Sequence, residues 1–340
     1  ATDDPERKEY SLDKINEASM HLLGVINDIL DVSKIEAGKF EISSAEFELE
    51  KMVLRVATVM NFRIDEKKQD FIVKIDRGVP RYLISDEQRL AQVLTNLLGN
   101  AVKFTPEAGR ITLSIEDTER HGNIHTLLVK VSDTGIGISA EQQTKLFQRF
   151  EQADGGIARK YGGTGLGLAI SKSIVELLGG DIWIESELDK GTTVAFRIPV
   201  EIGAGIHEAR WHPAINWKSL QLLAVDDAPE VLDYIADLTE ALGLHCETAA
   251  SGREAVKMIE ARPDTQPYDL IFVDWRMPEM NGIELTRAIK DRFGEHTIVI
   301  MISATEWSEI ETEAKAAGVD GYIPKPLFSS LIVDCINEYL

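Results

Sequence analysis

Apolar residues recur every three or four positions from about Glu6 to Gly38, which predicts a single long helix. The heptad seam consists of the apolar residues Leu12, Ile15, Leu22, Ile26 and Ile29 together with Ser19 and Ser33. Further apolar positions widen this face at Leu23, Val25, Leu30 and Val32. Because the face is wider than a two-stranded coiled coil would cover, the pattern favours a helical bundle. Gly38 is expected to end the helix.

The pattern between residues 40 and 200 changes to strands interspersed with amphipathic helices. After a first strand that follows Phe40, helices are predicted at 49–66, 90–105, 140–147 and 165–178, and strands at 71–75, 110–116, 126–132, 181–187 and 192–199. Helices grouped against a largely antiparallel sheet make an α+β sandwich.

Residues 201–218 are rich in glycine, proline and tryptophan, and they are predicted to be a linker. Trp211 and Trp217 either dock this linker onto a neighbour or pack on the surface. Beyond the linker, amphipathic helices alternate with apolar strands, which are expected at 221–225, 244–248, 270–273, 298–302 and 321–323. This alternation predicts a doubly wound parallel sheet, whose ligand sites lie at the carboxyl ends of the strands.

The predicted helix 90–105 carries polar residues opposite its apolar face. Its apolar residues are Leu90, Val93, Leu94, Leu97, Leu98 and Ala101. Asn96 and Asn100 lie one turn apart on the other side, and Lys103 continues their row. Carboxamide oxygens can ligate Mg²⁺, and an ammonium group can meet phosphate. By itself, this spacing also describes a solvated helix face.

Two glycine-rich segments follow that helix. Asp133-Thr-Gly-Ile-Gly-Ile138 comes after a strand, so Asp133 emerges at the strand end while Gly135 and Gly137 let the backbone approach a flat ligand. A carboxylate there can accept a hydrogen bond from an adenine amino group. Residues 162–168 open the next helix, whose N–H groups and positive dipole end suit phosphates. They lack the Gly-Lys-Ser/Thr of a Walker A loop and do not follow a strand as a dinucleotide fingerprint does.

Acidic residues stand at the strand ends of the second domain. Asp226 and Asp227 end its first strand, and Asp274 ends its third. Three converging carboxylates would repel one another unless a cation bridged them, which implies Mg²⁺. Ser303 and Lys325 end the fourth and fifth strands and bring a hydroxyl and an ammonium to the same rim. The alternative is a metal-binding or solvated acidic patch without covalent chemistry.

Charge and composition exclude several function classes. The net charge is −21, of which −14 falls in residues 219–340 and −7 in residues 1–218, so nucleic-acid binding is disfavoured. No apolar run approaches the roughly 20 residues that span a bilayer, and no signal peptide opens the chain. Cys246 and Cys335 lie far apart without metal-ligand spacing, which predicts reduced core thiols. These features predict a cytoplasmic chain without membrane contact of its own and leave open a membrane anchor in a longer protein.

Helix 90–105, the Asp133 loop and the glycine cluster, in this order, resemble the GHKL (Bergerat) ATP-binding fold of sensor histidine kinases. The resemblance covers nearly all of residues 40–200. It implies ATP as ligand, with phosphates and Mg²⁺ met by Asn96, Asn100 and Lys103, and Mg²⁺ itself on Asn100. It implies that adenine lies against Asp133, Gly135 and Gly137. It further implies that the phosphate side is lined by Gly163, Thr164, Gly165, Leu166 and Gly167. Arg159 would stabilise charge on the γ-phosphate.

One position separates kinases from hydrolases in this fold. Gyrase-like relatives carry a glutamate general base one turn before the second asparagine, at the position of Asn96. Because an amide cannot accept a proton at neutral pH, Asn96 favours phosphotransfer over hydrolysis.

The second domain resembles the response-regulator receiver, a flavodoxin-like α/β fold, throughout residues 219–340. The resemblance implies that Asp274 is the phosphoacceptor. It implies that Mg²⁺ is held by Asp226, Asp227, Asp274 and the Arg276 carbonyl. Ser303 and Lys325 would contact phosphoryl oxygens, Tyr322 would report the switch, and the Lys325–Pro326 bond is a candidate cis peptide.

Together these features predict the catalytic and receiver portion of a hybrid sensor histidine kinase. Its expected parts are the second helix of a dimerisation and phosphoacceptor hairpin (1–39), the ATP-binding domain (40–200), a linker (201–218) and a receiver (219–340). The first hairpin helix, which carries the phosphorylated histidine in this family, is missing. His207-Glu208-Ala209-Arg210 matches that histidine box only in part, and His21 lies on the second helix. The fragment is therefore expected to bind Mg-ATP without phosphorylating a histidine of its own.

The expected partners follow from the same resemblance. They are a second copy joined through the helical bundle, the helix that carries the acceptor histidine, and a downstream phosphotransfer or response-regulator protein. In the intact protein, the phosphoryl group would pass from that histidine to Asp274. The rival hypothesis is a non-catalytic nucleotide-binding scaffold, or phosphate sink, that acts with a separate kinase. An acceptor histidine upstream of Ala1 would distinguish the two.

Overall fold

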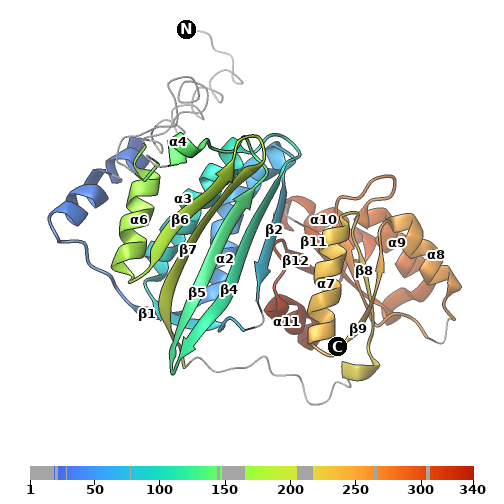
Figure 1. The fold of residues 1–340 in the computed structure, drawn as a ribbon. Helices are drawn as coiled ribbons and strands as arrows, with labels where there is room; N and C mark the ends of the chain where they lie inside the picture. The colour runs from blue at the N-terminus through green and yellow to red at the C-terminus, as the bar shows by residue number, and fades with distance from the viewer. Residues whose placement is uncertain are drawn as a thin grey trace, which may run out of the picture. The chain divides into compact units, whose positions relative to one another are not determined.

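The structure is a computed structural model of the 340-residue chain. It describes residues 19, 22–27, 29–76, 78–143, 146–147, 165–204, 217–263, 266–303 and 307–340. The chain divides into two compact units, Ala1–Gly205 and Ile206–Leu340 (Figure 1).

A seven-stranded sheet forms the centre of the first unit. Its order is β1-β3-β7-β5-β4-β2, and β6 pairs with β7. The strands are β1 (Ala45–Glu48), β2 (Asp70–Ile75), β3 (Tyr82–Ser85), β4 (Arg110–His121), β5 (Ile124–Asp133), β6 (Asp181–Glu187) and β7 (Gly191–Ile202). Among the described strands of this sheet, β2 and β4 form the one parallel pair, and the other pairs are antiparallel. The predicted α+β sandwich is confirmed.

Helices cover one face of this sheet (Figure 1). They are α2 (Leu49–Glu66), α3 (Glu87–Phe104), α4 (Ala140–Gln143) and α6 (Gly167–Leu177). α3 packs against both α2 and α6 and also touches β5. Buried positions alternate with more exposed ones along β5, as expected for a strand with one face against the helices.

Several elements differ from the sequence prediction. Helix α3 begins at Glu87 instead of residue 90, and the helix predicted at 140–147 is described as α4 only over Ala140–Gln143, with a turn at residues 146–147. β3 was not predicted, because a four-residue strand after Pro80 is too short to show a period. β4 continues past residue 116 through a register shift between Asp117 and Glu119, where its residues become polar. β7 extends to Ile202 and so includes two residues that were predicted to belong to the linker.

A helix precedes the sheet and is bound to α3. Residues 22–27 and 29–36 are helical, and Gly38 has a φ of +63° just past the end, as predicted for a C-cap. Asp31 accepts hydrogen bonds from Arg89 (3.3 Å) and Gln92 (2.9 Å) of α3. The exposed apolar residues of this helix are Leu22, Leu23, Ile26, Ile29 and Leu30. No helix in the described ranges is long and apolar enough to cross a membrane.

The second unit is a parallel sheet of five strands in the order β12-β11-β10-β8-β9. The strands are β8 (Gln221–Val225), β9 (His245–Ala249), β10 (Leu270–Asp274), β11 (Ile298–Ser303) and β12 (Gly321–Pro324). The helices are α7 (Pro229–Ala241), α8 (Gly252–Ala261), α9 (Gly282–Phe293), α10 (Trp307–Ala317) and α11 (Ser329–Tyr339), with short 3-10 turns at Trp217–Ser219 and Gly294–His296. The predicted doubly wound sheet is confirmed.

Hydrophobic cores lie on both faces of the parallel sheet. On one face, residues such as Phe272 pack with α7 and α11, and Trp217 packs against the same core. On the other face, residues such as Ile271 pack with α8 and α9. Both cysteines are free; Cys335 is buried and Cys246 is half-buried against the same core, and burial raises the pKa of both thiols to about 12.

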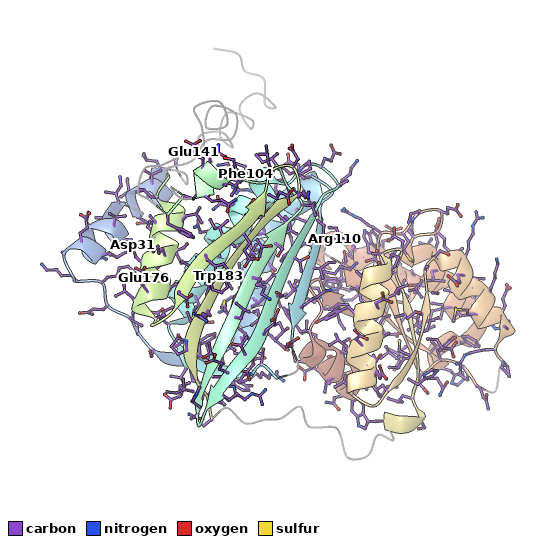
Figure 2. The ribbon with its side chains drawn as sticks, viewed as in Figure 1. Asp31, Phe104, Arg110, Glu141, Glu176 and Trp183 are labelled. Atoms are coloured by element: carbon purple, nitrogen blue, oxygen red, sulfur yellow. The ribbon has the colours of Figure 1, made fainter. Side chains whose placement is uncertain are left out.

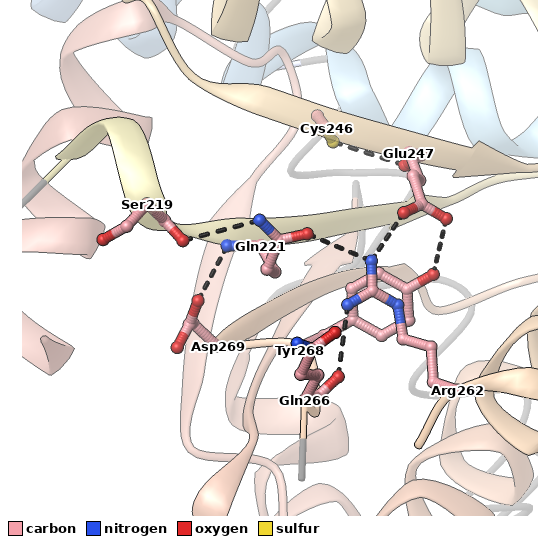
Figure 3. Close-up of polar contacts among 8 residues, drawn as sticks. All are labelled: Ser219, Gln221, Cys246, Glu247, Arg262, Gln266, Tyr268 and Asp269. Atoms are coloured by element: carbon pink, nitrogen blue, oxygen red, sulfur yellow. Dashed lines mark hydrogen bonds and ion pairs between the residues drawn. The ribbon is translucent and has the colours of Figure 1, made fainter. Parts of the chain in front are cut away.

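A polar network fixes the edge of this sheet at the amino ends of the strands (Figure 3). The Arg262 guanidinium lies 3.8 Å from the centre of the Tyr268 ring and donates to Glu247 at 2.6 Å and to Gln221 at 3.1 Å. The Tyr268 hydroxyl donates to Glu247 at 2.8 Å. The network therefore joins β8, β9 and the segment before β10.

Candidate functional site

Helix α3 presents the predicted amide and ammonium groups to one side of the first unit. Asp86 caps the helix by accepting a hydrogen bond from the Arg89 N–H at 3.0 Å. The buried face of α3 comprises Leu90, Val93, Leu94, Leu97, Leu98, Ala101 and Val102. Burial of that face leaves Asn96, Asn100 and Lys103 half-buried. Their predicted placement on one side of the helix is what the structure shows.

Asn96 joins α3 to α6. Its Nδ2 donates to the hydroxyl of the buried Ser171 at 2.8 Å. A Cβ built on Gly167 would lie 2.2 Å from Asn96 Oδ1, so a larger residue at the first position of α6 would displace the Asn96 side chain. α6 begins after Leu166 without a side-chain cap, and N–H groups at such an end can bind an anion.

The Asp133 loop adjoins the end of α3. A Cβ on Gly135 would lie 2.6 Å from the Phe104 carbonyl oxygen, so the loop and the last residue of α3 are in close contact. Phe104, the last residue of α3, is labelled in Figure 2. The Gly135 N–H donates to Asp133 Oδ1 at 2.8 Å. α3 therefore contacts both glycine segments, one through Asn96 and the other through Phe104.

The electrostatics of this site are set by burial. Burial raises the pKa of Asp133, although the backbone N–H groups of Gly135 and Thr192 oppose the shift. Burial lowers the pKa of Lys103, whose ammonium lies 4.9 Å from the centre of the Phe104 ring. Both charges therefore stand where water screens them less than at an open surface.

Ser186 holds the Asp133 loop and was missed by sequence reasoning. Its hydroxyl accepts from the Ile138 N–H and donates to the Gly191 carbonyl, both at 2.8 Å. Gly137 in the same loop has a φ of +66°, and a Cβ there would lie 2.0 Å from the Glu187 carbonyl oxygen. No local sequence signal marks these contacts, because Ile138 is 48 positions from Ser186 and Asn96 is 75 positions from Ser171.

The structure places part of the predicted phosphate segment. Gly165, Leu166 and Gly167 lie at the start of α6. Arg159, Gly163 and Thr164 lie outside the described residues.

The second unit brings the predicted acidic residues together at the carboxyl ends of β8 and β10. Oxygens of Asp226, Asp227 and Asp274 all lie within 4.8 Å of one another. Asp226 Oδ1 accepts from the Ala228 N–H, and Asp274 Oδ2 accepts from the Arg276 N–H, each at 2.9 Å. Asp274 and Asp226 are buried, whereas Asp227 is exposed.

Lys325 reaches into this cluster. Its Nζ lies 2.7 Å from Asp274 Oδ1 and 2.9 Å from Asp226 Oδ2. Burial raises the pKa of Asp274 to about 6; Lys325 opposes this shift and Asp226 adds to it. Burial also raises the pKa of Asp227, with Asp226 contributing. Burial alone would lower the pKa of Lys325, but Asp274 and Asp226 raise it, so the ammonium stays charged.

Ser303 and Tyr322 lie beside the cluster on neighbouring strands. Asp274 pairs with Ile302, so Ser303 lies one residue beyond the position opposite Asp274. The Ser303 carbonyl accepts from the Lys325 N–H at 2.9 Å and from the Tyr322 hydroxyl at 3.2 Å. The Lys325–Pro326 peptide is cis. The structure thus brings the three carboxylates and the Lys325 ammonium together, with Ser303 at the end of the neighbouring strand.

Comparison with known proteins assigns both units to families. A family described as histidine kinase-, DNA gyrase B-, and HSP90-like ATPase matches residues 85–202. The response regulator receiver domain family matches residues 222–337.

Similar proteins carry both units. The autoinducer 2 sensor kinase/phosphatase LuxQ of Vibrio vulnificus (strain YJ016) is 34% identical over 321 residues, which are 93% of this chain and 37% of LuxQ. The sensory/regulatory protein RpfC of Xanthomonas campestris pv. campestris (strain 8004) is 30% identical over 372 residues, covering 98% of this chain and 50% of RpfC. The chain therefore spans no more than half the length of these relatives.

A solved structure supports the fold. Full-length ShkA, crystallised in complex with AMPPNP, matches with a TM-score of 0.50 and 22% identity, covering 100% of this chain and 93% of ShkA. The chain thus joins an ATPase domain of the histidine kinase, DNA gyrase B and HSP90 type to a response regulator receiver domain, and it belongs with the hybrid sensor histidine kinases.

Proposed function

We propose that the first unit binds ATP between α3, the Asp133 loop and the start of α6, for phosphorylation of a histidine. The observation that carries this proposal is the position of α3, which touches Gly167 through Asn96 and Gly135 through Phe104. An adenine amino group would donate to the Asp133 carboxylate, and the backbone at Gly135 and Gly137 would lie along the ring. ShkA, which has this fold, was solved with AMPPNP.

The phosphates are assigned to the other end of the same site. Asn96 and Lys103 would contact phosphate oxygens, and Gly165, Leu166 and Gly167 would supply the N-terminus of α6. Arg159, Gly163 and Thr164 complete this set by resemblance to the family. The Asn100 side-chain oxygen suits Mg²⁺, which prefers oxygen ligands. When bound, the ion would offset charge on the phosphates.

The acceptor histidine is proposed to lie on a separate helix of the phosphoacceptor hairpin, and not among the seven histidines of this chain. Asn96 cannot act as a general base on water, which reserves ATP for transfer. The exposed apolar face of the helix over residues 22–36 suits a bundle with that helix and with a second copy. In this proposal the chain alone would bind ATP without phosphorylating itself on histidine.

We infer that Asp274 of the second unit receives the phosphoryl group. A carboxylate oxygen of Asp274 would form a bond to phosphorus as the phosphorus–nitrogen bond of the phosphohistidine breaks, and the imidazole would leave with the bond electrons. Lys325 already contacts Asp274 and would neutralise charge on the phosphoryl oxygens, together with the Ser303 hydroxyl. The product would pass to a downstream phosphotransfer or response-regulator protein.

The acidic cluster fits Mg²⁺. Its carboxylate oxygens lie within 4.8 Å of one another, and their repulsion is of the kind that a divalent cation relieves. Asp226, Asp227 and Asp274 would hold the ion with the Arg276 carbonyl. The ion would supply charge neutralisation to the transfer.

ATP binding is tested by isothermal titration calorimetry with Mg²⁺. We expect Asp133→Asn to weaken ATP binding about ten- to a hundredfold, because a charged acceptor is lost from a buried site. Asp181→Asn is the matched control, since Asp181 is exposed at the start of β6. Equal affinity for Asp133→Asn, Asn100→Ala and the parent would refute the site.

A further inference from the structure

The carboxyl end of α3 has backbone carbonyls that the helix itself cannot satisfy. The last four carbonyls of any helix lack an intrahelical donor, and the end of the helix carries partial negative charge. In α3 these carbonyls belong to the residues around Lys103, which the proposed site uses to contact phosphate. Whatever binds them fixes the backbone from which the Lys103 side chain starts.

Lys67, just after α2, binds this end of α3. Its Nζ donates to the carbonyls of Val102 at 2.7 Å, Lys103 at 3.0 Å and Thr105 at 3.1 Å. An ammonium group has three donors, so all of them are used on this one helix end. The positive charge also opposes the negative end of the helix dipole.

Gln69, two residues further on, binds the same end. Its Nε2 donates to the carbonyls of Val102 at 3.1 Å and Thr105 at 2.8 Å, from a buried position. The turn that carries both side chains is itself fixed, because the Ala108 N–H donates to the Lys67 carbonyl at 3.0 Å and the Asp70 N–H donates to the Gly109 carbonyl at 2.9 Å. The two side chains thus act from a backbone that is tied to the segment following α3.

We propose that Lys67 and Gln69 are positioning residues of the nucleotide site, which hold the end of α3 so that Lys103 meets the ATP phosphates. This inference rests on the proposed ATP binding. Neither residue touches the proposed ligand, and both act through the carbonyls of residues 102–105. A shift of the order of 1 Å in a positioned group is enough to cost much of its effect.

The test is a double-mutant cycle on ATP affinity, measured by calorimetry with Mg²⁺ on the full 340-residue chain. Lys67→Met keeps the side-chain length but removes the three donors, and we expect it to weaken ATP binding about tenfold. In a Lys103→Met background, the same change should cost less than about twofold, because the contact that it serves is already lost. Lys68→Met is the matched control: Lys68 is a neighbouring lysine whose side chain is 78% exposed, and we expect parental affinity.

Several results would overturn the inference. Lys67→Met binding ATP as tightly as the parent would do so, and so would a full tenfold loss in the Lys103→Met background, which would indicate a general structural effect. If Lys67→Met does not fold, as judged by circular dichroism, Gln69→Met replaces it in the same cycle with the same two criteria. A parent chain that binds no ATP would instead refute the nucleotide site itself.

Discussion

Tyr268 is a single side chain whose proton couples to folding. It is fully buried; burial and its hydrogen bond to Glu247 raise its pKa to about 12, with Arg262 opposing. The unfolded chain would lose this proton near pH 10. The folded state binds more protons than the unfolded state between these values, so stability is full below about pH 10 and falls as the pH rises toward 12.

Urea unfolding of the parent and of Tyr268→Phe at pH 9 and pH 11 checks this prediction. The parent should lose more stability between the two values than the variant, because phenylalanine has no proton to lose. Cys246 and Cys335 shift in the same direction in both proteins, so the difference between the two isolates Tyr268. An identical loss in both proteins would contradict the assigned role.

The sequence predicts the residues that would bind ligands better than it predicts the residues that hold them in place. Asp226, Asp274 and Lys325 could be placed together because they follow the ends of parallel strands, which meet at one edge. The partners of Asn96 and Lys103 could not be found in this way. Ser171 is 75 positions from Asn96, and Lys67 binds carbonyls some 35 positions away, so no local period records the contact.

At the scale of elements, two glycines should respond to alanine with opposite signs. Gly137 combines a φ of +66° with a Cβ position 2.0 Å from the Glu187 carbonyl oxygen, so Gly137→Ala should destabilise the first unit by about 2 kcal/mol or more. Gly99 lies within α3 with open space around its Cβ position, so Gly99→Ala should stabilise by about 0.5–1 kcal/mol.

Chemical unfolding followed by circular dichroism gives both values, and each variant serves as the control for the other. A Gly137→Ala variant that is as stable as the parent would contradict the account of the Asp133 loop, and a destabilised Gly99→Ala variant would contradict the open space around Gly99 in α3. The length of an element decides how well the sequence predicts it. The 18-residue helix α2 was predicted with its observed bounds because its apolar period repeats over several turns, whereas the four-residue strand β3 is too short to show a period and was not predicted.

For the molecule as a whole, the central expectation is transfer from ATP to a separate histidine and then to Asp274. Incubated with radiolabelled ATP and Mg²⁺, the chain alone should gain no acid-labile phosphohistidine. Addition of a polypeptide that carries the family's His-bearing hairpin should give label on that polypeptide and then on the chain, and Asp274→Asn should block the second step only.

Label on a histidine of the chain itself would contradict this proposal. ATP binding without any transfer to the added hairpin would favour the rival view, in which the chain is a nucleotide-binding scaffold that works with another kinase.

The most direct test of the phosphoacceptor is intact-mass measurement after incubation with acetyl phosphate and Mg²⁺. We predict one phosphoryl adduct on the parent and on the control Asp233→Asn, whose aspartate is exposed on α7. The adduct should be absent from Asp274→Asn, and its yield should fall when Mg²⁺ is chelated, because the carboxylate cluster then lacks the charge that offsets the phosphoryl oxygens. An adduct that forms on Asp274→Asn in full yield, or none on the parent, would contradict the account.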